Sequence, residues 1–147
     1  MTESLTIAVP RAFDGIRQLL AEADLPEPDP DLSRLSDFRE ITLDGRVVGC
    51  VGVEPYGDAG VLRSLAVAEE MRGRGLGGRL VDAAEALARG NGHRAVYLLT
   101  TTAAPFFEQH GYLRMSRDAV PDAVRRSSLF AACCPASAVC LGKTLSL

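Results

Sequence analysis

The chain has 147 residues, 47% of them hydrophobic and 24% charged, and its net charge at pH 7 is −3. This composition excludes a disordered chain and suits one domain over residues 1–147, while the acidic balance argues against a general nucleic-acid binder. No apolar run approaches the length that spans a membrane, and the first residues lack the basic start and apolar stretch of a signal peptide. We therefore expect a cytoplasmic protein.

The N-terminal half of the chain is predicted to form one helix and a run of strands. A short strand is expected over residues 5–9, and apolar residues at helical spacing predict a helix over 11–23. The proline-rich segment 26–31 ends that helix. Asp44-Gly45 is a strong hairpin signal, and a second turn is expected over 55–58. The strands around these turns, expected to form an antiparallel meander, cover residues 38–43, 46–54 and 60–67.

The C-terminal half is predicted to alternate helices and strands. A helix with one apolar face is expected over 75–89, and Asn91-Gly92 ends it. The dense apolar segment 94–100 predicts a strand that is buried on both faces. The remaining elements are a helix over 103–110, a strand over 112–115, a helix over 121–133 and a strand over 138–145. This order predicts an α+β domain, in which helices flank a mixed, mostly antiparallel sheet of about seven strands and an extra helix precedes the last strand.

The most informative segment joins the third strand of the meander to the following helix, and it reads Arg72-Gly73-Arg74-Gly75-Leu76-Gly77-Gly78. Glycines allow a tight turn, and the amide hydrogens of such a turn can converge on an anion. The start of the helix adds unpaired amides and the positive end of its dipole. Since Arg72 and Arg74 add positive charge, the segment predicts a phosphate or pyrophosphate site; the alternative is an ordinary surface turn.

The letters of Gly73 to Gly78 also satisfy G-x-G-x-x-G, the fingerprint of dinucleotide-binding folds. Those folds need the first glycine directly after a strand and an acidic residue about twenty positions later. Here residues 68–72 separate the strand from the glycine, and no acidic residue lies between Asn91 and Phe107. A Walker A loop fails because no Gly-Lys-Ser/Thr closes it. Dinucleotide binding is therefore the minor alternative.

Arg72-Gly73-Arg74-Gly75-Leu76-Gly77 matches the R/Q-x-x-G-x-G/A motif of the GCN5-related N-acetyltransferases. Leu65-Ala66-Val67 before it and residues 106–112 after it resemble the flanking segments of that family, and the order of elements is similar over nearly the whole chain. Residues 97–103 and 134–138 look more particularly like acetyltransferases associated with arsenic resistance. The resemblance implies an enzyme that acetylates a small-molecule amine, which could be an arsenic-containing amino acid.

The same resemblance implies acetyl-coenzyme A (acetyl-CoA) as the co-substrate. Its pyrophosphate would lie on the amides of residues 73–78, with Arg72 and Arg74 nearby, and its pantetheine arm would run beside Leu65, Ala66 and Val67 on a strand that splays from the next one. A main-chain amide there would hold the oxyanion while the amine attacks directly in a ternary complex.

Two positions expected to contact acetyl-CoA depart from the family pattern. Thr100 stands where the family commonly has an asparagine, and Phe107 stands where it has the tyrosine that protonates the leaving thiolate. Phenylalanine cannot donate a proton, so another tyrosine, a water molecule or simple release of the thiolate must serve.

The acceptor side is expected to involve residues outside the glycine loop. Glu54 is the candidate base, with a solvated strand-end carboxylate as the alternative, and Tyr97 is a candidate proton donor or a packing residue. Arg63 could clamp the carboxylate of an amino-acid-like acceptor if it faces the cleft, or be solvated if it faces outward. Phe106 and Phe130 are expected to form pocket walls or core.

The four cysteines are expected to be free thiols, and the absence of any C-x-x-C pair predicts no metal site. Two rival functions stay open: a non-catalytic acyl-CoA sensor, and a metalloid-binding protein that uses Cys133, Cys134 and Cys140. For these three cysteines, the alternative is that they pack as small apolar side chains.

The expected partner is a small-molecule amine, with no nucleic acid and no membrane; a homodimer is expected only by analogy with similar folds.

Overall fold

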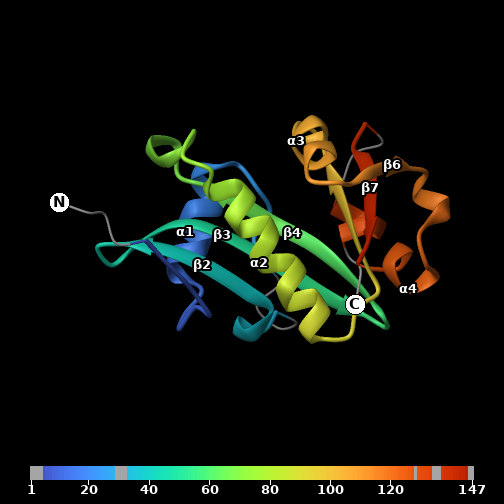
Figure 1. The fold of residues 1–147 in the computed structure, drawn as a ribbon, viewed down its shortest axis with the longest axis horizontal. Helices are drawn as coiled ribbons and strands as arrows, with labels where there is room; N and C mark the ends of the chain where they lie inside the picture. The colour runs from blue at the N-terminus through green and yellow to red at the C-terminus, as the bar shows by residue number, and fades with distance from the viewer. Residues whose placement is uncertain (1–4, 29–32, 128, 134–136, 146–147) are drawn as a thin grey trace. The chain divides into compact units, whose positions relative to one another are not determined.

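The computed structural model describes residues 5–28, 33–127, 129–133 and 137–145. Their strands form a seven-stranded sheet in the order β1-β2-β3-β4-β5-β7-β6 (Figure 1). The pairs β1–β2, β2–β3, β5–β7 and β6–β7 are antiparallel, and β4–β5 is parallel. This mixed sheet confirms the predicted α+β class and excludes a doubly wound dinucleotide fold. The strands are β1 (Leu5–Ala8), β2 (Phe38–Leu43), β3 (Arg46–Tyr56), β4 (Ala59–Val67), β5 (Ala95–Thr100), β6 (Leu113–Met115) and β7 (Val139–Thr144).

The helices follow the predicted order, with one correction. The α-helices are α1 (Asp14–Glu22), α2 (Leu76–Gly90), α3 (Ala104–Gln109) and α4 (Asp122–Arg125), with short 3-10 helices over Leu35–Asp37, Glu69–Met71 and Arg117–Ala119. The predicted single helix over 121–133 is wrong, because α4 ends at Arg125 and a separate π-helical turn covers Leu129–Cys133. The buried Ser127 hydroxyl accepts a bond from Phe130 N (3.4 Å), which is how a serine competes with continuous helical bonding.

The chain divides into two compact units, residues 1–53 with 64–84 (unit 1) and residues 54–63 with 85–147 (unit 2). In unit 1 the turn between β2 and β3 has left-handed backbone at both Asp44 (φ 52°) and Gly45 (φ 80°), as the hairpin signal predicted. Helix α1 packs on β3 where Gly15 meets Val47, and α2 packs on β3 where Leu80 meets Gly49. In the view of Figure 1, α2 lies in front of β3 and α1 behind it.

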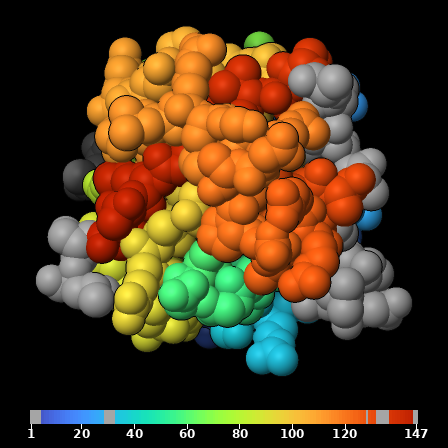
Figure 2. Space-filling view, turned by 90° about the vertical axis from the view of Figure 1, so that its right-hand side faces the viewer, coloured from blue at the N-terminus to red at the C-terminus, as the bar shows by residue number. Residues whose placement is uncertain are grey.

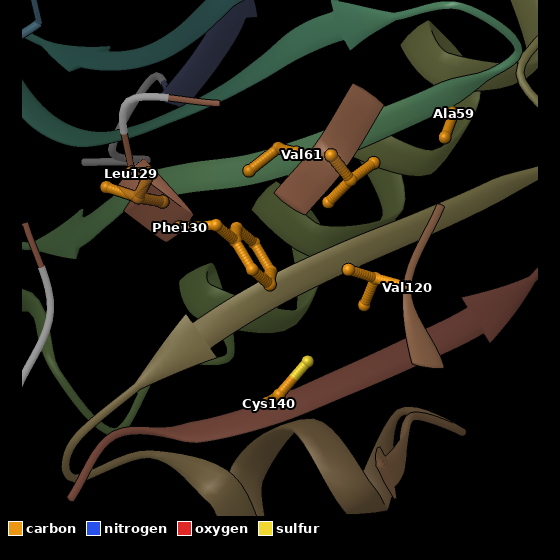
Figure 3. Packing of buried hydrophobic residues seen from close by; sticks show 7 residues of the cluster. Ala59, Val61, Val120, Leu129, Phe130 and Cys140 are labelled. Atoms are coloured by element: carbon orange, nitrogen blue, oxygen red, sulfur yellow. The ribbon is translucent and has the colours of Figure 1, made fainter. Parts of the chain in front are cut away.

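In unit 2, the parallel register joins Ala59–Val61 of β4 to Ala95–Tyr97 of β5, and β7 lies between β5 and β6. Strand β5 is not buried on both faces as predicted: Val96 and Leu98 are buried, but the other residues of the strand are half-buried. Figure 2 shows that the orange part of the chain, which includes α3, β6 and α4, covers much of the face of this unit that is turned to the viewer. The apolar core of the unit, shown in Figure 3, is made of Ala59, Val61, Val120, Val124, Leu129, Phe130 and Cys140.

A glycine in β7 provides the space that the ring of Tyr97 occupies. A β-carbon at Gly142 would lie 2.8 Å from Tyr97 Cδ1 and 2.8 Å from Met115 Sδ. We expect Gly142→Ala to lower the free energy of unfolding by about 1–3 kcal/mol, the usual cost of overpacking. Gly90→Ala is the matched control, since its β-carbon would meet no atom within 4 Å. This change should stabilise the protein by about 0.4–1 kcal/mol. Urea unfolding followed by circular dichroism measures both changes. If the free energy of unfolding of Gly142→Ala equals that of the native protein, the ring of Tyr97 moves aside.

Candidate active site

The glycine loop in unit 1 has the backbone that the sequence predicted. Gly73 (φ 81°) and Gly75 (φ 78°) are both left-handed, and a β-carbon at either would meet no atom within 4 Å. Helix α2 begins directly after, and Arg79 N donates its helical bond to Gly75 O (3.2 Å). The helix therefore offers no main-chain acceptor to the amides of Leu76, Gly77 and Gly78, which come before Arg79. Such first-turn amides, next to two glycines with open space beside them, suit an anion such as a diphosphate.

The loop is anchored to the end of β4 by short-range bonds. Met71, which is buried, donates its N–H to Ala68 O (2.8 Å), and Arg72 N donates to Glu69 O (3.2 Å). The Arg72 side chain turns back, so that its Nε donates to Val67 O (3.3 Å). Arg72 thus braces the loop, whereas Arg74 is exposed beside the glycines. The bracing role of Arg72 was not part of the sequence prediction.

An open hollow of about 300 Å³ lies in unit 1 between the end of α1 and the end of β4. Its lining residues include the carboxylates of Glu22, Glu69 and Glu70 together with Arg72. Glu70 is also paired with Arg46. The hollow is therefore of mixed charge and gives no preference for or against an anion.

Strand β4 changes direction just before the residues expected to meet the pantetheine arm. Ser64 has a left-handed backbone (φ 59°), which is rare for a residue other than glycine. Of the next three residues, Ala66 is buried, and Leu65 and Val67 are half-buried. Within unit 2, β4 pairs with β5 in parallel from Ala59 and Ala95 to Val61 and Tyr97.

Glu54 and Arg63 form a nearly buried ion pair in unit 2. Arg63 Nη1 lies 3.0 Å from Glu54 Oε1, and the two side chains are only 7% and 12% exposed. The alternative of an outward, solvated Arg63 is therefore wrong, as is that of a solvated Glu54 at a strand end, because β3 continues to Tyr56. Such a pair holds one positive and one negative group at fixed positions out of bulk water.

Tyr97 and Phe130 belong to the packed interior of unit 2. Tyr97 is half-buried against the apolar core, and Phe130 is one of its buried members (Figure 3). Burial raises the pKa of the Tyr97 hydroxyl, and the charges of Asp58 and Cys140 raise it further. Tyr97 therefore holds its proton more firmly than an exposed tyrosine. The position of Phe130 favours a core role over a pocket wall.

The remaining predicted contacts lie around α3. Phe107 is buried, and its ring packs edge-on against Phe106 (5.2 Å between centroids) and Tyr112 (5.5 Å). Phe106 is half-buried. The hydroxyl of Thr100 accepts a bond from Ala103 N (3.0 Å), which fixes the turn that leads into α3. Phe107 and Thr100 thus have structural roles of their own in the protein.

Sequence reasoning missed a buried polar cluster in unit 2. Lys143 Nζ lies 3.0 and 3.1 Å from the two carboxylate oxygens of Glu85, and Tyr112 Oη donates to the same carboxylate at 3.1 Å. Glu85 is only 5% exposed. The signal that could have found it is a carboxylate on the apolar face of α2, between the buried Val81 and Ala88.

The cysteines carry no evidence for a metalloid site. Cys50 and Cys140 are free and buried, while the side chain of Cys133 and all of Cys134 lie outside the described residues. Among the residues that the structure describes, no group of three His, Cys, Asp or Glu could hold a metal ion. In the same part of the chain, no helix is both long enough and apolar enough to cross a membrane.

A fourth strand that leads through left-handed glycines into a helix, within this mixed sheet, is the arrangement that the resemblance to acetyl-CoA-dependent acetyltransferases implied. The family model described as "Acetyltransferase (GNAT) domain" matches residues 38–114, just over half of the chain. The chain belongs to the GNAT acetyltransferase family.

Three relatives illustrate this membership. An uncharacterized N-acetyltransferase of Chlorobaculum tepidum is 33% identical over 96 residues, which are 65% of this chain and 61% of that protein. An amino-acid acetyltransferase of Ralstonia nicotianae is 34% identical over 120 residues, 76% of this chain but only 27% of that protein. The fold is shared with N-acetylglutamate synthase from Neisseria gonorrhoeae, solved with coenzyme A and N-acetyl-glutamate (TM-score 0.83, 23% identity, 100% of this chain and 36% of that one). This chain thus spans about a quarter to three fifths of these relatives.

Proposed function

We propose that this protein transfers the acetyl group of acetyl-CoA to the amino group of a free amino acid. The Arg63–Glu54 pair carries this proposal, since its groups lie 3.0 Å apart and nearly buried. A free amino acid bears one carboxylate and one ammonium group, and the pair offers a guanidinium for the first and a carboxylate for the second. The relatives named amino-acid acetyltransferase and N-acetylglutamate synthase support the same class of acceptor.

For the donor, we infer that the diphosphate of acetyl-CoA binds the amides of residues 73–78. The left-handed glycines and the first turn of α2 fit this group, and Arg74 lies exposed beside them. The pantetheine arm would follow Leu65 to Val67, directly after the bend at Ser64. A main-chain N–H of these residues would stabilise the oxyanion that develops on the thioester carbonyl.

The proton transfers are assigned to residues of unit 2. Glu54 would take one proton of the ammonium group, which leaves a neutral amine and passes that proton to solvent. The amine nitrogen then forms a bond to the carbonyl carbon, and as the carbon–sulfur bond breaks the nitrogen loses its second proton, which replaces the proton given to the departing thiolate. Phe107 has no proton to give, so Tyr97, whose raised pKa keeps it protonated, is the candidate acid for the leaving thiolate.

The test is release of free thiol from acetyl-CoA with a panel of acceptors. Free amino acids should turn over, whereas their carboxyamides and simple primary amines, which lack the carboxylate, should react at least about tenfold more slowly. An arsenic-containing amino acid is one arm of the panel, because of the subgroup resemblance. Tight binding of CoA with no turnover of any amine would instead favour a non-catalytic acyl-CoA sensor.

Substitution of the ion pair should separate chemistry from acceptor binding. Glu54→Gln is expected to lower kcat by about 10²–10⁴-fold, because the general base is lost. Arg63→Met is expected to raise the KM for the amino acid by about 10–100-fold, the value of a charge-assisted hydrogen bond, without changing the affinity for CoA. Steady-state kinetics and calorimetric titration with CoA measure both.

The controls for these variants address folding. Arg63→Met leaves the Glu54 carboxylate buried without this partner, so the double variant Arg63→Met/Glu54→Gln shows whether loss of stability explains the effect. Arg114→Met removes an arginine from an exposed pair with Glu108 and should change neither constant. An unchanged KM for the amino acid in a folded Arg63→Met protein would refute the clamp.

A further inference from the structure

Cys50 makes an unusual contact between two strands of unit 1. It lies within β3, is fully buried, and its thiol donates a hydrogen bond to the main-chain oxygen of Ser64 in β4 (Sγ–O 3.2 Å). Burial, with a smaller contribution from the carboxylate of Glu40, raises the pKa of the Cys50 thiol to about 12, although a main-chain hydrogen bond from Ala66 acts in the opposite direction. The thiol therefore keeps the proton that it donates throughout the physiological pH range.

Ser64 is the residue at which this contact matters. It is one of only three non-glycine residues with positive φ in the described part of the chain, and the other two, Asp24 and Asp44, lie in turns. A left-handed residue inside a strand is strained and persists only where its surroundings fix it. A main-chain hydrogen bond from Ala66 also acts to lower the pKa of the Cys50 thiol. One sulfur atom thus engages the main chain on both sides of Leu65.

We propose that Cys50 is a positioning residue for acetyl transfer, which holds the bend of β4 at Ser64 and so directs the peptide groups of Leu65 to Val67. This inference rests on the proposed function, in which those peptide groups meet the pantetheine arm and the thioester. The thiol sets the direction of the Ser64 carbonyl, and the orientation of the next peptide groups follows from it. Cys50 touches neither substrate.

The choice of residue is open to direct test, because two substitutions separate shape from hydrogen bonding. Cys50→Val keeps a small apolar side chain but removes the donor, and Cys50→Ser keeps a donor, a stronger one on a shorter bond. We expect Cys50→Val to lower kcat by about 3- to 10-fold, as for one hydrogen bond, while the affinity for CoA changes by less than about twofold. Cys50→Ser should restore kcat to within about twofold of the native value.

A second readout does not depend on activity. Amide hydrogen exchange of the protein without ligand should show faster exchange at residues 64–67 in Cys50→Val, and near-native exchange there in Cys50→Ser. Val48→Ala is the matched control, since Val48 is buried two residues earlier in β3 and has no side-chain hydrogen bond to lose. It should lower the melting temperature but leave kcat and the exchange of residues 64–67 unchanged.

The inference is overturned if Cys50→Val has native kcat and native exchange at residues 64–67. It is equally overturned if Cys50→Ser lowers kcat as much as Cys50→Val does, or if Val48→Ala lowers kcat as much as Cys50→Val does. Failure of the proposed function is distinguishable, because the native protein would then release no thiol with any amine. The exchange experiment would still report whether Cys50 holds the bend.

Discussion

Replacing Gly75 with alanine is expected to weaken the binding of CoA by about 10–100-fold in a protein that still folds, since a charge-assisted hydrogen bond lost to the diphosphate has about this value. The backbone at Gly75 is left-handed (φ 78°), and its missing β-carbon points into open space. An added methyl group would shift the turn that presents the first amides of α2, and it would occupy space where the diphosphate is proposed to lie. Calorimetric titration with CoA measures the change.

Gly45 provides the matched control for this substitution. It has nearly the same backbone (φ 80°) and the same absence of atoms within 4 Å of a β-carbon, but it lies in the β2–β3 turn. Both alanine variants should lose about 1–2 kcal/mol of stability, the cost of a side chain in the left-handed region. Only Gly75→Ala should lose affinity for CoA. Equal affinity in the two variants would place the diphosphate away from the glycine loop.

The features that were predicted from sequence depend on local backbone rules. Asp44-Gly45 forms its hairpin, and the glycines before α2 form their left-handed turn, because glycine and aspartate favour these conformations whatever surrounds them. The order of strands and helices follows from hydrophobic periodicity and these turn signals. Such rules were sufficient for the class of the fold and for the position of the loop.

The features that were missed depend on contacts between residues far apart in the chain. Arg63 could not be assigned an inward position until its partner Glu54 was known. The sequence alone does not show which residues of this strand face the interior of the protein and which face solvent. Ser64 carries no glycine signal, so its left-handed backbone is visible only in the structure. The helix predicted over 121–133 failed because its periodicity does not show that the hydroxyl of Ser127 bonds the main chain.

Lys143→Met is expected to cause the largest loss of stability. Glu85 is buried, and Lys143 Nζ is bound to both of its carboxylate oxygens. Removal of the ammonium leaves a buried carboxylate with Tyr112 Oη at 3.1 Å and Arg89 at 3.8 Å. Stranding a buried charge costs about 3–5 kcal/mol, a large share of the roughly 5–15 kcal/mol that stabilises a typical domain. The melting temperature should fall by about 6–20 °C, measured by circular dichroism.

Two further variants identify the cause of that loss. Arg114→Met breaks an exposed ion pair and should cost less than about 1 kcal/mol. The double variant Lys143→Met/Glu85→Gln removes the stranded charge but keeps an acceptor for Tyr112, so it should recover at least half of the lost stability. If the double variant is no more stable than Lys143→Met, the stranded charge is not the cause. The cost then comes from the bond that Lys143 Nζ donates to His110 O (2.9 Å) and from its packing over the ring of Tyr112, and the network would serve mainly to fasten β7 to the end of α3.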